Sequence, residues 1–235
     1  KEHLTDISEL VVKEKAHLGI VVDPDVDRLA FISEDGEMFG EEYTLVACAD
    51  YVLSKTPGNT VSNMSSSRAL RDVTNAHKGS YEASAVGEVN VVELMKKNNA
   101  IIGGEGNGGI IYPELHYGRD SLVGVALFLT HLANKKMKVS ALRASYPEYY
   151  MSKNKIELTP QIDVDAILVA MTAKYKNEDI TTIDGVKIDF ATEWVHLRKS
   201  NTEPIIRIYT EAPSQQAADV LALRIIDEIK VIAGI

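Results

Sequence analysis

The sequence predicts an α/β protein in which a parallel, helix-covered sheet is followed by a smaller α+β domain at the C-terminal end. Two observations lead to this prediction. Up to about residue 133, short apolar runs typical of buried strands alternate with segments of helical period. From residue 140 onward the pattern changes, and several short strand-like runs follow one another before a long amphipathic segment closes the chain.

The first part alternates helices and strands. The helices are expected over 6–14, 41–53, 66–77, 91–98 and 119–133, and the strands over 18–22, 29–32, 60–64, 81–86 and 100–103. We expect serines to cap the third helix and the glycine-rich segment 103–109 to break the regular pattern. In the fifth helix the apolar residues predicted to point inward are Leu122, Val125, Ala126, Leu129 and Leu132.

In the second part, we expect helices over 142–145, 163–175 and 217–232, and strands over 149–158, 180–184, 186–190, 194–198 and 205–210.

Composition excludes several classes of protein. The 235 residues are 45% hydrophobic and 25% charged, with 25 basic and 34 acidic side chains and a net charge of −9. This balance argues against a nucleic-acid surface, which needs clustered Lys and Arg. The single Cys48 is interpreted as a packing residue in a reducing compartment, and no apolar run is as long as a membrane span. A cytoplasmic protein is therefore expected.

The start of the chain indicates a fragment. It begins at Lys1 without a Met, and only one short helical segment precedes the first strand. Because one helix and one strand cannot enclose a core, we expect further strands of this layer to lie upstream.

The segment Asp23-Pro24-Asp25-Val26-Asp27-Arg28 is the first candidate site. It follows the apolar run 18–22, at the position where open α/β sheets bind ligands. Three alternating carboxylates repel one another unless a cation neutralises them, and oxygen ligands favour Mg²⁺, Ca²⁺ or Mn²⁺ over zinc. Arg28 would allow a phosphate to lie between metal and guanidinium. The alternative is a solvated acidic turn, which has no need of so much charge.

The glycine-rich segment Gly103-Gly104-Glu105-Gly106-Asn107-Gly108-Gly109 is the second candidate site. Glycine allows a backbone to approach a ligand closely, and Glu105 and Asn107 would hydrogen-bond neighbouring hydroxyls of a sugar. A flexible surface turn is the alternative. The segment does not match a dinucleotide-binding loop, because no long helix starts directly after it.

The third candidate is Arg198-Lys199-Ser200-Asn201-Thr202-Glu203-Pro204, between two predicted strands, with Arg207 beyond it. Guanidinium groups, hydroxyls, an amide and the N–H groups of a turn can together bind a phosphate dianion. The alternative is a polar β-turn in which Arg198 forms a surface salt bridge.

Other polar groups are weaker candidates. The six His residues show no ligand spacing, and Ser65, Ser66 and Ser67 are better explained as a helix cap than as a nucleophile. Arg119 and Asp120 are interpreted as a helix start with an acidic first turn.

These three segments resemble, in this order, the motifs of the α-D-phosphohexomutases, the family of phosphoglucomutases, phosphomannomutases and phosphoglucosamine mutases. The acidic segment is similar to the family's metal loop, usually D-G-D-x-D-R. The glycine-rich segment looks like its sugar-specificity loop, commonly G-E-x-S-G-H, and the third resembles its phosphate loop, often R-x-S-G/N-T-E-P. The resemblance covers nearly the whole chain.

The resemblance implies a role for each motif residue. It implies Mg²⁺ on Asp23, Asp25 and Asp27, with Arg28 steadying a phosphoserine. It also implies sugar contacts from Glu105 and Asn107. The residues implied to bind the substrate phosphate are Arg198, Ser200, Asn201 and Thr202, with Arg207 in support.

The family's reaction, as the resemblance implies it, interconverts hexose 1-phosphates and hexose 6-phosphates through a phosphoserine and a bisphosphate intermediate. Nothing in this sequence resembles the phosphoserine loop, and Gly109 stands where many members have His. We therefore expect the end of a second mutase domain (1–39), a third domain (40–139) and a C-terminal domain (140–235), inactive alone. The implied partners are a hexose phosphate and the missing N-terminal half, and a homodimer is possible within the family.

Two other functions stay open at this point. One is a haloacid-dehalogenase-type phosphatase with Asp23 as nucleophile and Asp25 as general acid, although that motif usually has Thr or Val in place of Asp27. The other is a sugar-phosphate-binding module without chemistry.

Overall fold

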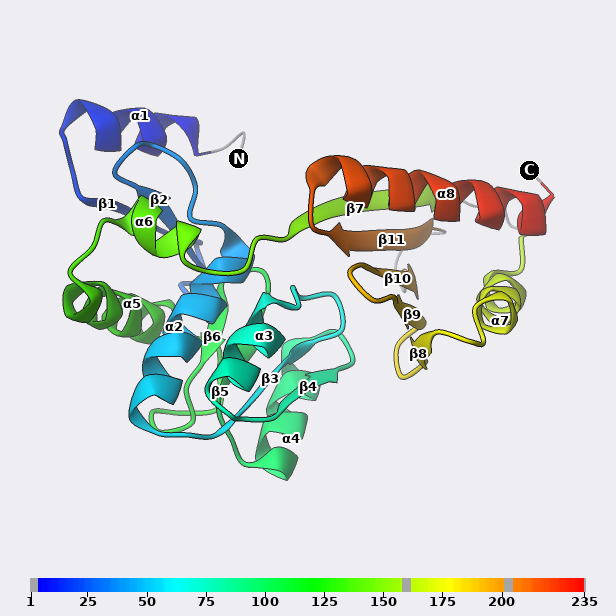
Figure 1. Ribbon diagram of the computed structural model, residues 1–235, viewed down its shortest axis with the longest axis horizontal. Helices are drawn as coiled ribbons and strands as arrows, with labels where there is room; N and C mark the ends of the chain where they lie inside the picture. The colour runs from blue at the N-terminus through cyan, green and yellow to red at the C-terminus, as the bar shows by residue number, and fades with distance from the viewer. Residues whose placement is uncertain (1–3, 158–161, 201–204, 235) are drawn as a thin grey trace. The chain divides into compact units, whose positions relative to one another are not determined.

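The protein forms two compact units, Lys1–Pro147 and Glu148–Ile235. The computed structural model describes residues 4–157, 162–200 and 205–234 (Figure 1). The prediction of an α/β part followed by an α+β domain is confirmed. The predicted domain boundaries near residues 39 and 139 stay predictions.

The first unit contains mixed α/β structure. Its helices are α1 (Thr5–Lys13), α2 (Glu41–Lys55), α3 (Ala69–Ala76), α4 (Glu88–Asn98), α5 (Ser121–Lys135) and α6 (Val139–Ala144). Its strands are β1 (Leu18–Val22), β2 (Leu29–Ser33), β3 (Asn59–Asn63), β4 (Tyr81–Ser84), β5 (Ala100–Glu105) and β6 (Gly109–Ile111).

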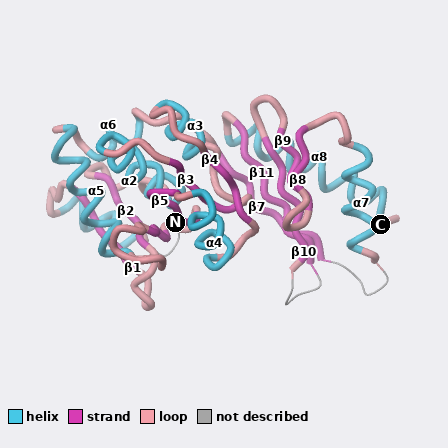
Figure 2. The backbone as a smooth tube through the Cα atoms, turned by 90° about the horizontal axis from the view of Figure 1, so that it is seen from below, coloured by secondary structure: helices cyan, strands magenta, loops and turns pink. Residues whose placement is uncertain are grey.

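The central sheet of this unit has the strand order β4-β3-β5-β6, with β3 parallel to both β4 and β5 and with β6 antiparallel at the edge. The chain crosses from β3 to β4 in one direction and returns past β3 to β5 in the other. Because such crossovers are right-handed, α3 and α4 fall on opposite faces of the sheet (Figure 2). The predicted parallel, helix-covered sheet is therefore correct, apart from its antiparallel edge strand.

The strand before the acidic loop belongs to a separate hairpin. Among the described residues, β1 pairs only with β2, antiparallel, with Val22 opposite Leu29. The acidic loop follows a strand as predicted, and the expectation that this strand belongs to a larger open α/β sheet stays a prediction. Phe31 of β2 anchors the hairpin, because its ring stacks on Phe128 of α5 at 3.9 Å between centroids.

The glycine-rich segment is more regular than predicted. Gly103 and Gly104 continue β5, and Gly109 begins β6, so the segment forms a tight hairpin. A Cβ atom on Gly104 would lie 2.0 Å from the carbonyl oxygen of Gly109. The glycines thus allow two backbones to approach closely, and the positive φ of Gly108 (85°) suits a three-residue hairpin loop.

Helix α5 buries a different face from the one predicted. Leu122 and Leu129 are exposed, at 67% and 42%, while Gly124, Phe128 and His131 are buried. A Cβ atom on Gly124 would lie 2.9 Å from a Leu29 methyl group, so the helix packs closest along its small residues. The N-terminus is as expected, since the Asp120 carboxylate caps the helix by accepting from the Val123 N–H at 3.0 Å.

A polar network lies inside the first unit, away from the candidate site. The Asp50 carboxylate contacts His77 Nε2 at 2.7 Å and His131 Nε2 at 3.1 Å, and it accepts from the Tyr146 hydroxyl at 3.2 Å. Burial alone raises the pKa of Asp50, but the hydrogen bonds to His131 and His77 outweigh burial and hold its pKa below the usual value. The folded state is therefore stabilised while this carboxylate is ionised.

We expect Asp50→Asn to lower the free energy of unfolding by about 1–3 kcal/mol at pH 7, because a charged hydrogen-bond acceptor is lost. Since the folded-state pKa lies below the unfolded one, this contribution is complete above about pH 5 and falls as the pH drops below about 4. Urea denaturation at several pH values measures it. A difference between the two proteins that does not shrink in acid would contradict the assignment. Asp6→Asn, in the exposed first turn of α1, is the control.

The second unit is an α+β domain. Its elements are β7 (Tyr150–Glu157), α7 (Val164–Lys174), β8 (Asp179–Thr181), β9 (Val186–Asp189), β10 (Trp194–Lys199), β11 (Ile205–Ala212) and α8 (Gln215–Ala233). The sheet is antiparallel, with the order β7-β11-β10-β9-β8. Side chains cap the N-termini of both helices, Asp163 for α7 and Ser214 for α8.

One face of this sheet carries the core of the second unit. Val195, Leu197 and Ile208 point to it and pack with Leu221 and Ile225 of α8. Because side chains alternate along a strand, Arg198 lies on the opposite face.

Across the residues that the structure describes, no helix has the length and apolarity needed to cross a bilayer.

Candidate functional site

The acidic loop, Asp23 to Arg28, connects β1 to β2 and is organised by its first carboxylate. Asp23 Oδ1 accepts hydrogen bonds from the backbone N–H groups of Asp27 and Arg28, at 3.2 and 3.1 Å. Although burial alone raises the pKa of Asp23, these hydrogen bonds hold it below the usual value. The loop thus carries an ionised carboxylate that also shapes its backbone.

The tip of the loop has an unfavourable backbone conformation. Val26 has a φ of 57°, in the left-handed region that β-branched residues avoid. Its carbonyl oxygen accepts from the Ser121 hydroxyl at 2.8 Å and from the Ser121 N–H at 3.4 Å. The N-terminus of α5 therefore holds the loop in this shape, and such strain is typical of functional sites.

The three carboxylates of the loop fit a divalent cation. One oxygen from each of Asp23, Asp25 and Asp27 can be chosen so that all lie within 4.8 Å of one another. Asp27 Oδ1 is buried and accepts no hydrogen bond, so a ligand is needed to satisfy it. Arg28 Nε lies 4.0 Å from both Asp23 Oδ2 and Asp27 Oδ1. A donor set made only of carboxylate oxygens suits Mg²⁺.

Glu105 is held in place by neighbours on three sides. Its side chain is buried, and Oε1 accepts from Asn63 Nδ2 at 2.8 Å and from the Gly87 N–H at 3.2 Å. Oε2 accepts from Arg119 Nη1 at 2.8 Å. These contacts come from β3, from the start of α4 and from the segment before α5, and nothing in the local sequence around Glu105 indicates them.

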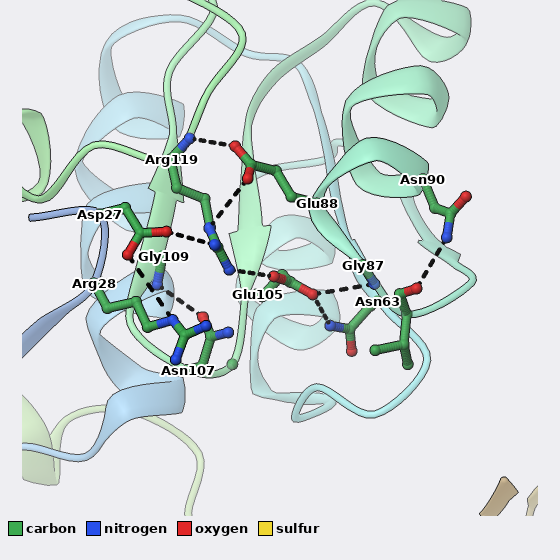
Figure 3. Close-up of polar contacts among 12 residues, drawn as sticks. Asp27, Arg28, Asn63, Gly87, Glu88, Asn90, Glu105, Asn107, Gly109 and Arg119 are labelled. Atoms are coloured by element: carbon green, nitrogen blue, oxygen red, sulfur yellow. Dashed lines mark hydrogen bonds and ion pairs between the residues drawn. The ribbon is translucent and has the colours of Figure 1, made fainter. Parts of the chain in front are cut away.

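Arg119 is the residue of this site that sequence analysis missed. Its guanidinium forms ion pairs with Asp27, Glu88 and Glu105, and its side chain is only 14% exposed (Figure 3). Its backbone N–H also donates to Glu88 at 2.8 Å. Arg119 thus joins the acidic loop to the glycine-rich hairpin. Its neighbour Asp120 is a helix cap, and this explains why both residues were interpreted as a helix start.

Asn107, at the tip of the glycine-rich hairpin, shares a small pocket with the acidic loop. The pocket measures about 240 Å³, and its polar lining residues are Asp23, Arg28, Glu41 and Asn107. The Asn107 side-chain oxygen accepts from the Gly109 N–H at 3.1 Å. The backbone is also linked here, since the Leu29 N–H donates to the Gly108 carbonyl at 3.1 Å. The first two predicted segments therefore lie next to each other.

The described part of the third predicted segment, residues 198–200, lies at the end of β10, which pairs antiparallel with β11. Arg198 and Arg207 are directly opposite each other on these strands, so their side chains leave the same face of the sheet. Arg198 Nε contacts the Asp184 carboxylate at 2.8 Å and 3.0 Å, and the Ser200 N–H donates to the Ile205 carbonyl at 3.0 Å. Asn201 and Thr202, also predicted to bind phosphate, lie outside the described residues.

His196 lies beside this pair of arginines on the same face. It is buried, and burial lowers its pKa to about 4, although its Nε2–H donates a hydrogen bond to the Asp184 carbonyl oxygen at 2.7 Å, which acts in the opposite direction. A neutral imidazole is therefore present at pH 7, and the positive charge of β10 and β11 comes from their arginine and lysine side chains.

The weaker candidates have structural roles. Asn63 Oδ1 accepts from the Ser65 N–H and the Ser66 hydroxyl, and the Ser67 hydroxyl accepts from the Ala69 N–H, so the serines shape the turn before α3. Ser67 thus accepts from the first residue of α3, whereas the N-cap residue itself, Arg68, makes no side-chain cap hydrogen bond. Burial raises the pKa of Cys48 to about 12, in agreement with a packing role.

Two protein-family models match the chain. Residues 40–150 match the model described as phosphoglucomutase/phosphomannomutase, alpha/beta/alpha domain III. Residues 153–228 match the one described as phosphoglucomutase/phosphomannomutase, C-terminal domain.

Curated relatives have similar names. The chain is 35% identical over 219 residues to a phosphoglucomutase/phosphomannomutase of Thermococcus kodakarensis, covering 93% of the chain and 48% of the relative. It is 32% identical over 234 residues to a phosphoglucosamine/phosphogalactosamine mutase of Sulfurisphaera tokodaii, covering 97% and 50%. The chain thus spans about half the length of these relatives.

Solved structures share the fold. A phosphoglucomutase/phosphomannomutase family protein from Burkholderia thailandensis superposes with a TM-score of 0.83 at 23% identity, covering 98% of this chain and 50% of that one. A putative phosphomannomutase from Thermus thermophilus gives a TM-score of 0.74 at 23% identity, with coverages of 97% and 50%. None of these similarities favours the dehalogenase-type phosphatase or the binding module without chemistry.

Proposed function

Because the chain belongs to the phosphoglucomutase/phosphomannomutase family, we propose that it is the C-terminal half of a phosphohexomutase. This isomerase would interconvert hexose 1-phosphates and hexose 6-phosphates through a phosphoserine and a bisphosphate intermediate. The observation that carries the proposal is the meeting of the acidic loop and the glycine-rich hairpin around one pocket. Positioning and charge neutralisation supply most of the catalysis in such phosphoryl transfers.

In this proposal Asp23, Asp25 and Asp27 hold Mg²⁺. The fit rests on their clustered oxygens and on the unsatisfied Asp27 Oδ1. Bound Mg²⁺ supplies charge neutralisation at a phosphoryl group. Arg28 lies at the edge of the same loop and its side chain is half exposed, so its guanidinium is accessible to the transferring phosphate.

The sugar would be recognised by the glycine-rich hairpin. Asn107 lines the pocket and would contact a sugar hydroxyl directly. Glu105 keeps acceptor capacity, because each carboxylate oxygen has two lone pairs and Oε2 accepts a hydrogen bond from Arg119 at 2.8 Å. We assign both residues to sugar hydroxyls. Titration with three different hexose 6-phosphates would identify the preferred hexose.

The substrate phosphate that does not react would bind to the second unit. Arg198 and Arg207 extend from one face as a pair, and Ser200 follows Arg198 closely along the chain. Two guanidinium groups on one face are a suitable anion site, and Asn201 and Thr202 would add donors. Asp184, which pairs with Arg198, keeps that side chain oriented.

The other partners are part of the proposal. The N-terminal half of the same enzyme would supply the phosphoserine, since nothing in this sequence resembles that loop. A homodimer is one assembly that the family resemblance allows. We expect the 235-residue chain alone to bind hexose phosphates without turnover. Incubation with a hexose 1-phosphate should give no 6-phosphate, and addition of the N-terminal half should restore the reaction.

Calorimetric titration with glucose, mannose and glucosamine 6-phosphate tests the phosphate site. We expect binding of at least one sugar phosphate and a loss of roughly tenfold or more in Arg198→Ala, because a charge-assisted hydrogen bond to the phosphate disappears. Arg224→Ala is the matched control, because Arg224 is half exposed and pairs with Glu193. Equal affinities of wild type and Arg198→Ala would refute the phosphate assignment.

A further inference from the structure

Arg119 occupies the space that a side chain at position 109 would need. A Cβ atom on Gly109 would lie 2.4 Å from Arg119 Cδ and 3.1 Å from Arg119 Cγ. Separations below 3.0 Å are not found for real Cβ atoms, so one of the two side chains must yield. Gly109 and Arg119 are therefore a matched pair, in which the glycine leaves room for the arginine to cross the hairpin.

The Arg119 side chain crosses over Gly109, and its guanidinium contacts both the acidic loop and the glycine-rich hairpin. One end forms an ion pair with Asp27 Oδ2, and the other donates to Glu105 Oε2 at 2.8 Å. Glu88 holds the guanidinium from a third side, with Oε2 at 3.4 Å from Nε. Figure 3 shows the side chain lying between these carboxylates. A rigid, planar guanidinium can bridge them in this way, whereas a lysine ammonium is a single point charge.

The two oxygens of Asp27 have separate tasks. Oδ2 pairs with Arg119, while Oδ1 is the buried atom without a hydrogen-bond donor in the described structure. A cation bound at Oδ1 therefore acts on the same carboxylate that Arg119 contacts at Oδ2. Glu105, at the other end of the guanidinium, in turn orders Asn63 and the Gly87 N–H.

We propose that Arg119 is a positioning residue that couples occupancy of the metal site to the order of the glycine-rich hairpin. The bound cation fixes Asp27, Asp27 fixes the guanidinium, and the guanidinium fixes Glu105. The inference rests on the proposed function in one respect, namely that Asp23, Asp25 and Asp27 hold Mg²⁺. It adds a residue outside the three sequence motifs and a linkage between two of them.

The first test measures this linkage without any substrate. Amide hydrogen exchange of residues 85–88 and 104–109 is followed in the 235-residue chain with and without saturating Mg²⁺, whose binding is verified by calorimetry. We expect Mg²⁺ to slow this exchange roughly fivefold or more in wild type and to have no effect on it in Arg119→Ala. Arg119→Lys should restore thermal stability in part but not the Mg²⁺ effect. Arg71→Ala, which removes an ion pair with Asp72 on α3, should behave as wild type.

The outcomes separate this inference from the proposed function. If Mg²⁺ binds and its effect on exchange persists in Arg119→Ala, the coupling runs elsewhere, for example through the Leu29–Gly108 hydrogen bond, and the inference is overturned. If wild type binds no Mg²⁺, the metal assignment and the linkage both fail. Hexose-phosphate binding does not enter this test, so a failure of the sugar or phosphate sites is seen only in the separate titrations.

A double-mutant cycle tests the matched pair without metal. Gly109→Ala should lower the melting temperature by about 3 °C or more, because the added methyl group overpacks against Arg119. In the Arg119→Ala background the same change should cost clearly less, because Cδ and Cγ are gone. Additive shifts in melting temperature would show that the two positions are independent, and would overturn the pairing.

Discussion

Asp25→Asn is expected to weaken Mg²⁺ binding by at least about tenfold, because the charge and number of oxygen ligands determine the affinity of such sites. Asp25 is the most informative ligand to change. Asp23 shapes the loop backbone and Asp27 pairs with Arg119, whereas Asp25 is exposed and makes no hydrogen bond or ion pair with the described residues. Calorimetric titration with Mg²⁺ measures the effect.

The control for this substitution is Asp35→Asn, at the turn after β2, where the carboxylate accepts from the Glu37 N–H at 3.1 Å. It removes the same charge from the same unit and should leave Mg²⁺ affinity unchanged. Both variants should melt close to wild type without metal. An Asp25→Asn protein that binds Mg²⁺ as tightly as wild type would show that the acidic loop is only a solvated turn.

Phe128→Ala is expected to lower the free energy of unfolding of the first unit by about 3–5 kcal/mol, the usual cost of truncating a buried phenylalanine. Phe128 is fully buried, stacks on Phe31 at 3.9 Å and meets Phe39 edge-on at 4.9 Å. Because Phe31 belongs to β2, which follows the acidic loop, the same substitution should also loosen the metal site. Urea denaturation followed by circular dichroism gives the stability change.

Leu122→Ala provides the contrast on the same helix. Its side chain is 67% exposed, so truncation should change stability by less than about 0.5 kcal/mol. The amphipathic pattern of the sequence, in contrast, places Leu122 in the core and therefore predicts a large loss of stability for Leu122→Ala. Equal destabilisation by the two substitutions would therefore contradict the packing of α5 described above.

The local patterns were sufficient to predict most elements and the three candidate segments. The alternation of apolar runs with helical segments predicted the parallel strands, and the clustered carboxylates predicted a cation site. Interactions between distant residues were not predictable in this way. Arg119 and Asp27 form an ion pair although they are more than 90 residues apart in the sequence. Because Arg119 stands next to the cap residue Asp120, the sequence around it is fully accounted for by the start of a helix.

One signal in the sequence could have pointed toward Arg119. Glu105 closely follows a predicted buried strand, and a carboxylate that is buried needs a cation or a hydrogen-bond donor. The prediction of the buried face of α5 was wrong for a different reason. Gly124 and Ser121 give no apolar signal, yet they face the core because close approach to β2 and β6 requires small side chains there.

The left-handed backbone of Val26 has a consequence for the speed of metal uptake. Because Ser121 holds the carbonyl of Val26 in the free chain, the conformational entropy of this loop is lost during folding and not when the ion arrives. A cation then meets ligands that are already gathered, and its entry is limited by the shedding of its own water molecules. In the proposed metal site, the strained backbone of Val26 would thus make cation binding faster.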